Sequence, residues 1–268
     1  MIFRTFRGVT IKYKIMRAIF YWIMILPFIV FSQGNGSYTV TENGMIIANP
    51  EFISEFESGV ANHNNKYHTD GQYGSRIYLI NNGPDYGKYL WVMGPIPWNA
   101  FDDRPQQEGH DEDWNKNIEP YTLTGGIQNY WRFYPDLSNF PKDFNIKKAK
   151  VDIYDVKRHK KEEVLTLMNK IKRVMREKYQ EDSYGVYYNE FPSEIAANDL
   201  MIVSFYQDSG WLGQPKDFSL KYEEVFGKGT FDKFFKEWES VTNGKQSELW
   251  SFREDLSGVD GEMKSSKN

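Results

Sequence analysis

A histidine in the middle of an apolar helix face is the residue best placed to do chemistry in this sequence. His63 stands among residues that recur at spacings of four, four, three and four, which is the period of an α-helix. A buried imidazole there could ligate haem iron or act as a base toward a buried ligand. A core histidine bonded only to a backbone carbonyl is the alternative interpretation. The face that carries it consists of Phe52, Phe56, Val60, His63 and Tyr67.

Segment 94–114 is the second candidate, because it combines aromatic, acidic and basic side chains with one histidine. It is longer than a usual connection, and long loops in compact domains tend to form lids or binding segments. Carboxylates with a histidine could bind a hard divalent cation. Their spacing matches no calcium-binding pattern, so we expect no metal site in the chain. The distinctive residues are Trp98, Phe101, Asp102, Asp103, Arg104, His110, Asp111, Glu112, Asp113 and Trp114.

Aromatic side chains are predicted to line a ligand site. Trp98 and Trp211 each follow the third predicted strand of one half of the chain, so they could be paired walls over two equivalent clefts. Packing of these indoles on neighbouring helices is the alternative. His68 lies near a helix end and off the apolar face, and we expect it on the surface or as a cap. The predicted ligand-binding residues are Tyr67, Trp91, Trp98, His110, Trp131, Trp211 and Trp250.

An aromatic segment that occurs twice organises the elements that must position these residues. Residues 131–138 and 250–257 share the pattern W-x-F-x-x-D-L-S and lie 119 positions apart. The repeated Asp136 and Asp255 each follow a strand and precede Leu-Ser, where an aspartate commonly caps a turn. The chain is therefore interpreted as two tandem versions of one module.

Each half carries one strand that is apolar on both faces. In the strand predicted over 86–93, Leu90 points one way and Trp91 the other. In the strand predicted over 200–206, Leu200 and its successor Met201 are opposed in the same way. Both faces of these strands must be covered.

The expected elements follow the same order in both halves: strand, helix, strand, strand, helix, strand. The first half is predicted as 45–48, 50–67, 76–81, 86–93, 114–121 and 127–134. The second half is predicted as 149–156, 159–178, 184–191, 200–206, 231–238 and the strand that contains Trp250.

In this order, in the echoed Tyr73-Gly74 and Tyr184-Gly185 pairs and in the repeated endings, the chain resembles the dimeric α/β-barrel superfamily of ferredoxin-like domains. The resemblance covers roughly 45–257. It implies an α+β fold with two tandem ferredoxin-like βαββαβ modules, packed sheet-to-sheet as a pseudo-dimeric barrel with helices outside. The superfamily includes cofactor-free monooxygenases, haem-degrading enzymes, chlorite-dismutase-like haem proteins and stress-induced proteins of unknown role. No catalytic signature matches, and the fold alone does not choose among them.

The first 32 residues have the composition of a secretory signal peptide. Five basic residues and no acidic one come before and at the start of the apolar run 18–31, which is shorter than the ~20 residues that span a bilayer. An uncleaved membrane anchor is the alternative, and Met16 could be the true start. We expect an exported, periplasmic or extracellular protein. The predicted divisions are 1–32 signal peptide, 33–41 linker, 42–140 first module, 141–257 second module and 258–268 disordered tail.

Composition excludes several classes of protein. Removing the five basic leader residues from 33 Lys and Arg leaves 28 against 37 Asp and Glu, a net charge of about −9, so nucleic acid is not an expected partner. The absence of cysteine excludes disulfides, thiolate metal sites and a cysteine nucleophile. Hydrophobic residues make up 40% of the chain, which is enough for a packed core.

The sequence therefore favours an exported protein that binds a small, partly apolar ligand in an aromatic-lined barrel cavity. The alternative is an oxygenase-like enzyme, haem-dependent or cofactor-free, with His63 and segment 94–114 at its site. A structural or partner-binding protein, with its cavity filled by side chains, is a third reading. Formation of a homo-oligomer and contact with a membrane through an uncleaved leader are further expectations.

Overall fold

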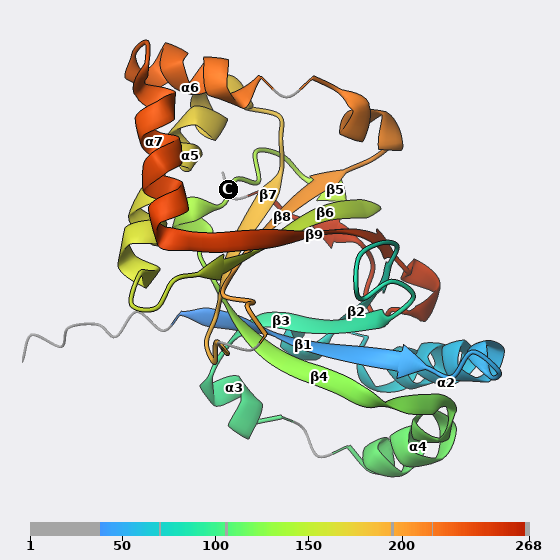
Figure 1. The fold of residues 1–268 in the computed structure, drawn as a ribbon. Coiled ribbons are helices and arrows are strands. Elements are labelled where there is room, and N and C mark those ends of the chain that lie inside the picture. Colours follow the sequence, from blue (N-terminus) through green and yellow to red (C-terminus); the bar gives the residue numbers. More distant parts are fainter. Residues whose placement is uncertain (1–37, 70, 105–106, 194–195, 216, 266–268) are drawn as a thin grey trace, which may run out of the picture. The chain divides into compact units, whose positions relative to one another are not determined.

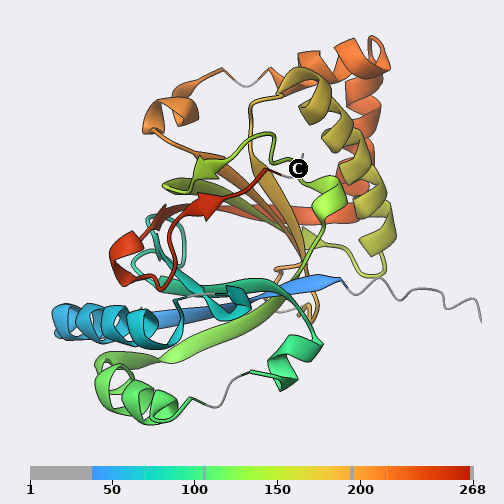
Figure 2. The same ribbon diagram turned by 180° about the vertical axis from the view of Figure 1, so that it is seen from behind.

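Eight antiparallel strands close into a barrel, and each half of the sequence contributes four of them (Figures 1 and 2). The order around the barrel is β1-β3-β2-β9-β6-β8-β7-β4. This is the α+β fold of two ferredoxin-like modules that the sequence predicts. The computed structural model describes residues 38–69, 71–104, 107–193, 196–215 and 217–265.

The first module contains a four-stranded sheet and three helices. Its elements are β1 (Thr39–Ala48), α2 (Ile53–Tyr67), β2 (Ser75–Ile80), β3 (Tyr89–Pro97), α3 (Asn99–Asp102), α4 (His110–Asn117) and β4 (Thr122–Phe133). Short 3-10 turns occur at η1 (Gly71–Tyr73), η2 (Glu119–Tyr121) and η3 (Pro135–Leu137).

The second module repeats the strand order and carries its own helices. Its elements are β6 (Lys148–Val156), α5 (Lys161–Lys178), β7 (Tyr184–Asn189), β8 (Leu200–Tyr206), α6 (Phe218–Phe226), α7 (Thr230–Val241) and β9 (Thr242–Phe252). The 3-10 turns η4 (Ser209–Gly213) and η5 (Glu254–Leu256) follow β8 and β9, and a small sheet pairs β5 (Phe144–Asn145) with β10 (Glu262–Met263).

The repeated aromatic segment closes the barrel in two equivalent places. Phe133 of β4 pairs with Tyr187 of β7, and Phe252 of β9 pairs with Tyr78 of β2. The two repeated tryptophans lie together in the apolar cluster inside the barrel. The prediction that the halves are equivalent and shield each other's sheets is confirmed.

The two-sided strands separate the barrel interior from the outer layers. Leu90 and Met201 belong to the interior cluster, whereas Trp91 and Leu200 pack against helices outside. On the first module α2 covers the outer face with η5. On the second module α5, α6 and α7 form the larger outer layer (Figure 1).

The barrel interior is filled by side chains. Its cavity measures only about 50 Å³, with Tyr78, Tyr187 and Trp250 among its walls. That volume suits about one water, whose share of the liquid is ~30 Å³. Two of the residues expected to line a ligand cavity, Trp131 and Trp250, occupy that space themselves, because large rings from both sheets meet there.

Several element boundaries differ from the sequence prediction for local reasons. The strand β1 begins at Thr39, so it includes the last residues of the expected linker. Asn49 and Pro50 do not begin the helix: the Asn49 side chain accepts a hydrogen bond from the backbone of Glu51, and this turn delays α2 to Ile53. The expected helix at 114–121 begins earlier, as α4.

Two further segments are more ordered than predicted. The irregular stretch before α7 contains the helix α6, whose Tyr222 is buried under α5 and α7. The tail predicted as disordered forms β10, and Arg76 donates to the backbone carbonyls of Asp260 and Glu262. These bonds attach the tail to the first module.

The predicted leader lies outside the described residues. Within the part of the chain that the structure describes, no helix combines the length and apolar character that a bilayer span requires. Export, leader cleavage, the module boundaries and formation of a homo-oligomer remain predictions.

Candidate functional site

Three histidines from different parts of the first module converge on the outer face of its sheet. His63 lies in the body of α2, His68 is the residue directly after α2, and His110 is the first residue of α4. One ring nitrogen from each lies within 4.8 Å of the others. Their rings also pack edge to face, with His63 and His110 centroids 4.7 Å apart.

His63 is held in a single orientation by a carboxylate. Its Nδ1 lies 2.9 Å from Oδ2 of Asp113, and its side chain is 1% exposed. A carboxylate accepts, so Nδ1 carries the hydrogen and Nε2 presents a lone pair. Nε2 is buried without a hydrogen-bond partner. Burial lowers the pKa of His63, against the opposite effect of Asp113, so the ring is neutral at pH 7.

The Nε2 atoms of His68 and His110 face each other. The His68 Nδ1 lies 2.9 Å from the Tyr73 carbonyl, and the His110 Nδ1 lies 2.8 Å from a carboxylate oxygen of Asp111. Both acceptors require a hydrogen on Nδ1, which leaves Nε2 unprotonated on each neutral ring. The two Nε2 atoms are 3.2 Å apart. Burial lowers the pKa of His68 to about 4.

A pocket of about 240 Å³ opens beside the cluster. Its walls are apolar where Ile46, Trp91 and Trp114 contribute, and the three histidines form one side. The polar end contains Glu42, which is 5% exposed and forms a 2.5 Å ion pair with Arg104. The remaining lining residues are Gly44 and Gln128, the latter hydrogen-bonded to the same glutamate.

The chain builds this pocket by bringing three elements over the sheet. Residues 42–46 supply its floor from the outward positions of β1, while α2 and α4 pack side by side above. Gly59 permits this approach, because a Cβ there would lie 2.1 Å from the Asn117 carbonyl oxygen. Together these elements could hold a metal ion at the histidines and an organic molecule beside it.

The predicted ligand-binding residues fall into three groups. Trp91 and His110 line the pocket, and the Tyr67 ring lies 5.1 Å from the His110 ring, behind the cluster. Trp131 and Trp250 fill the barrel interior. The other two do not line the pocket: Trp98 packs on Phe101, Tyr130 and Phe191, and Trp211 stacks on Tyr206 in the second module.

Sequence reasoning did not place His68 in the site, although one of its two expectations, a helix cap, is confirmed because His68 is the C-cap of α2. It is 6% exposed, not a surface residue, because the chain turns back through η1 and brings the Tyr73 carbonyl onto its ring. The spacing of five from His63 takes it off a continuous helix face, so helical periodicity alone hides it. His63 itself bonds to a carboxylate and not to the backbone carbonyl that the structural alternative assumed.

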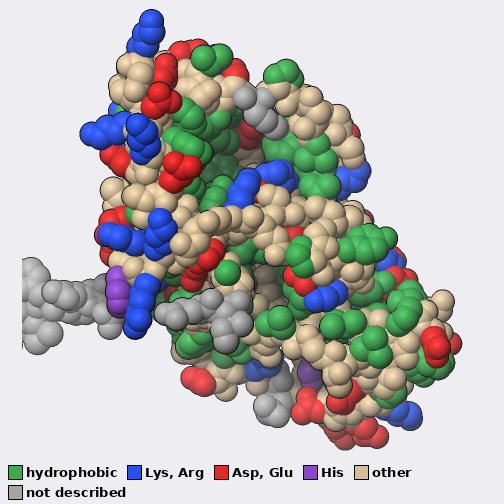
Figure 3. Space-filling model, viewed as in Figure 1, with side chains coloured by type: hydrophobic (Ala, Val, Ile, Leu, Met, Phe, Trp, Pro, Cys, Tyr) green, Lys and Arg blue, Asp and Glu red, His purple; other side chains and the backbone are tan. Residues whose placement is uncertain are grey.

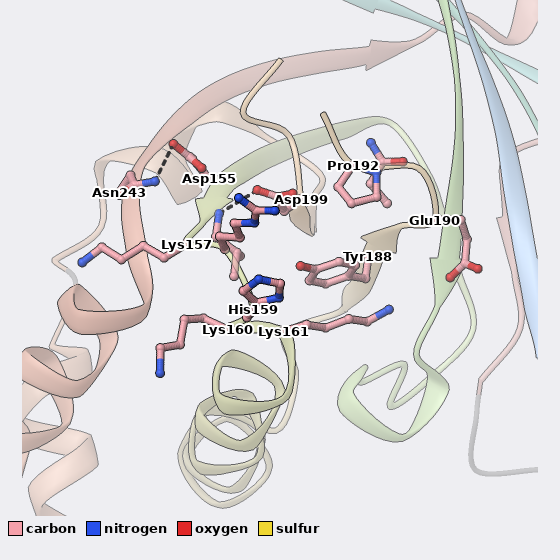
Figure 4. A pocket seen from close by; sticks show the side chains of 13 residues that line it. Asp155, Lys157, His159, Lys160, Lys161, Tyr188, Glu190, Pro192, Asp199 and Asn243 are labelled. Atoms are coloured by element: carbon pink, nitrogen blue, oxygen red, sulfur yellow. Dashed lines mark hydrogen bonds between the residues drawn. The ribbon is translucent and has the colours of Figure 1, made fainter. Parts of the chain in front are cut away.

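A larger and more basic pocket lies in the second module (Figure 4). It measures about 600 Å³ and lies around the turn between β6 and α5, where Lys157 to Lys161 are all basic. Tyr188 and His159 are among its lining residues (Figure 4), and the Lys161 ammonium lies 4.4 Å from the centroid of the Tyr188 ring. Lys and Arg side chains gather over this side of the molecule (Figure 3). No described residue of its lining has a buried polar atom without a partner, so the first-module pocket is the better candidate.

Comparison with known proteins supports the fold. No family model matches the sequence, and no curated protein matches it. Among solved structures, the chain is similar to a monooxygenase candidate from Lactobacillus acidophilus NCFM, with 10% identity, a TM-score of 0.54, and coverage of 85% of this chain and 99% of that one. A monooxygenase candidate from Fusobacterium nucleatum has 12% identity, a TM-score of 0.54, and coverage of 81% and 93%. A mutant chlorite dismutase from Candidatus Nitrospira defluvii has 8% identity, a TM-score of 0.52, and coverage of 82% and 93%.

Proposed function

We propose that this protein, which has the dimeric α/β-barrel fold of its structural neighbours in tandem form, binds a small and partly apolar molecule on the outer face of its first sheet. The observation that supports this most directly is the pocket of about 240 Å³ beside the histidine cluster. The barrel interior, at about 50 Å³, offers no comparable space.

The pocket combines apolar walls with a few polar groups. Most ligand sites have apolar walls and a few placed polar groups that fix the orientation of the ligand. Here Trp91 and Trp114 are half-buried and supply flat apolar surfaces, while Glu42 and the histidines supply polar atoms. The volume lies just below the ~300 Å³ at which drug-sized sites begin. A molecule of one or two rings is therefore the expected size class.

Binding of 2-naphthol, followed by saturation-transfer NMR, tests this site. The unmodified protein should give a saturable signal, and Trp91→Leu should weaken it at least tenfold because an aromatic wall is removed. Trp211→Leu is the matched control, since that indole stacks on Tyr206 in the second module. Equal binding by Trp91→Leu and the control, or no binding by any form, would overturn the assignment.

A second candidate function is oxygenase-like catalysis at the same pocket. The observation that favours it is the pairing of His63 with Asp113, because an imidazole oriented by a carboxylate can take a proton from a bound substrate. Two of the structural neighbours carry the name of monooxygenase candidates, and a third is described as an anthrone oxidase-like protein. Oxygen consumption with anthrone tests this candidate. It should be present in the unmodified protein and absent in His63→Gln.

Haem would use only part of the donor set. A haem iron offers two axial positions on opposite faces of its ring, because the porphyrin nitrogens fill the others. At most two of the three clustered imidazoles could serve such an iron, and at least one would be left without a role. The pocket of about 240 Å³ is also small for a macrocycle. No step of the proposed function therefore passes through haem.

A further inference from the structure

We propose that His63, His68 and His110 bind one divalent first-row transition-metal ion through their Nε2 atoms. The proposal deepens the ligand site proposed above, since the ion would form the polar side of that pocket. The sequence led us to expect no metal site, because the spacing of the carboxylates in segment 94–114 matches no calcium-binding pattern.

The hydrogen-bond pattern leaves the Nε2 of His63 without a partner, and the Nε2 atoms of His68 and His110 with only each other at 3.2 Å. Each Nδ1 faces a group that can only accept: the carboxylate of Asp113, the carbonyl of Tyr73 and the carboxylate of Asp111. Each Nδ1 therefore carries the hydrogen, and each Nε2 carries a lone pair. One ring nitrogen from each histidine lies within 4.8 Å of the others, and the Nε2 atoms of His68 and His110 are 3.2 Å apart.

Neither a water molecule nor a proton satisfies this arrangement. A water has two hydrogens and can donate to only two of the three nitrogens. A proton shared by His68 and His110, whose Nε2 atoms are 3.2 Å apart, would leave the buried Nε2 of His63 without a partner. A cation accepts all three lone pairs at once.

The separation of two of the three nitrogens fits a tetrahedral centre. Metal–nitrogen bonds of 2.0–2.1 Å place two imidazole nitrogens about 3.3 Å apart in a tetrahedral Zn²⁺ site. The separation of 3.2 Å between His68 and His110 is already close to that value. Imidazole ligands suit Zn²⁺, Fe²⁺, Ni²⁺ and Cu²⁺, whereas Ca²⁺ and Mg²⁺ prefer oxygen. Three protein ligands leave a position open toward the pocket, as in catalytic rather than structural sites.

The second layer of contacts has the form that metal-binding histidines require. Ligand histidines almost always donate their other N–H to a carboxylate or carbonyl, which fixes the ring and raises its basicity. All three histidines do so here. Asp113 is itself held by the side-chain amide of Asn117 at 2.8 Å, so its orientation is set before metal arrives. Asp113 is a positioning residue in this site.

Titration of chelator-treated protein, without a histidine tag, with Co²⁺ and then Zn²⁺ tests the proposal. We expect one ion per chain, the visible absorption of low-coordinate Co²⁺ with nitrogen ligands, and its loss when Zn²⁺ displaces Co²⁺. His110→Asn should weaken Zn²⁺ binding at least 100-fold, and Asp113→Asn by about 10–100-fold. His110 is 28% exposed at a helix start, so its replacement should leave the fold intact, as circular dichroism can verify.

The fourth histidine supplies the matched control. His159 is exposed in the second module and has a φ of 61°, a conformation that asparagine tolerates, so His159→Asn should bind Zn²⁺ as the unmodified protein does. Absence of stoichiometric Co²⁺ or Zn²⁺ binding, or full affinity in His110→Asn, would overturn the proposal. Binding of 2-naphthol is measured separately in metal-free protein. Naphthol binding without metal binding would support the ligand pocket and refute the metal site. Metal binding without naphthol binding would support the metal site and refute the ligand pocket.

Discussion

Replacing Gly59 by alanine should destabilise the protein although alanine is the better helix former. In an exposed helix the change would stabilise by about 1 kcal/mol. Here the added Cβ would lie 2.1 Å from the Asn117 carbonyl oxygen and 3.0 Å from its carbon. The obstacle is backbone at the end of α4, so no side-chain rotation can relieve it. The two helices must separate by about 1 Å to restore ordinary contact.

The expected magnitude follows from these opposing effects. Overpacking of a tight contact costs about 1–3 kcal/mol, and a backbone overlap of this depth belongs at the upper end or above it. Subtracting the gain in helix propensity leaves a net loss of about 2 kcal/mol. For a domain of this size, that loss corresponds to a fall in Tm of about 4–8 °C.

Thermal unfolding of Gly59→Ala by circular dichroism provides the measurement. Gly213→Ala is the control, because that glycine has nothing within 4 Å of its Cβ position and no positive φ, so its Tm should stay within about 1 °C. The displaced α4 also carries His110, so Zn²⁺ affinity should fall together with stability. An unchanged or higher Tm in Gly59→Ala would refute the close packing of α2 on α4 on which the site depends.

Two further changes test the buried polar groups. Asn64 is 1% exposed, donates to the Leu256 carbonyl at 2.7 Å and accepts from the Trp91 indole at 3.2 Å. Urea unfolding should therefore show that Asn64→Leu lowers the free energy of unfolding by about 2 kcal/mol. The control Asn169→Leu, on the surface of α5, should change it by less than about 0.5 kcal/mol. Burial raises the pKa of Glu248, which is 1% exposed, so the folded state keeps a proton that the unfolded chain releases above about pH 4.3. The free energy of unfolding should therefore fall as the pH rises through the folded-state pKa of Glu248. Urea midpoints measured against pH should show that Glu248→Gln removes this fall. The same dependence of the midpoint on pH in both proteins would contradict the account.

The sequence predicts the barrel well because the repeated segment and the strand periodicity both require sheets that are covered on two faces. A strand with apolar residues on both faces needs two covering layers. Leu90 and Met201 indeed lie inside the barrel, whereas the adjacent Trp91 and Leu200 lie outside it. The paired aromatic segments show where the modules join. Boundaries were less predictable, since side-chain hydrogen bonds such as that of Asn49 decide where a helix begins.

The site was only partly predictable for a related reason. His63 and the segment around His110 were found because one has helical periodicity and the other an unusual composition. Their meeting point depends on the approach of α4 to α2, which no local pattern encodes. His68 joins them through a turn whose carbonyl fixes its ring, and residue type alone gives no sign of that.

The two modules have diverged in a way that separates stability from function. In α5 the buried stripe Val164, Met168, Ile171 and Met175 has the same spacing as Phe56, Val60, His63 and Tyr67 in α2. Ile171 therefore occupies the place in the second stripe that His63 occupies in the first.

That exchange changes what each helix can contribute. Ile171 is partly buried and packs against the apolar cluster of the second module, which is the larger of the two outer cores. The first module instead buries an imidazole whose Nε2 has no protein partner, at a cost of about 1–3 kcal/mol. Destabilising features of this kind are retained mainly at functional sites, such as those that bind a ligand. Because the closed barrel joins the modules through β2–β9 and β4–β7, the well-packed half can support the half that carries the destabilising but useful cluster.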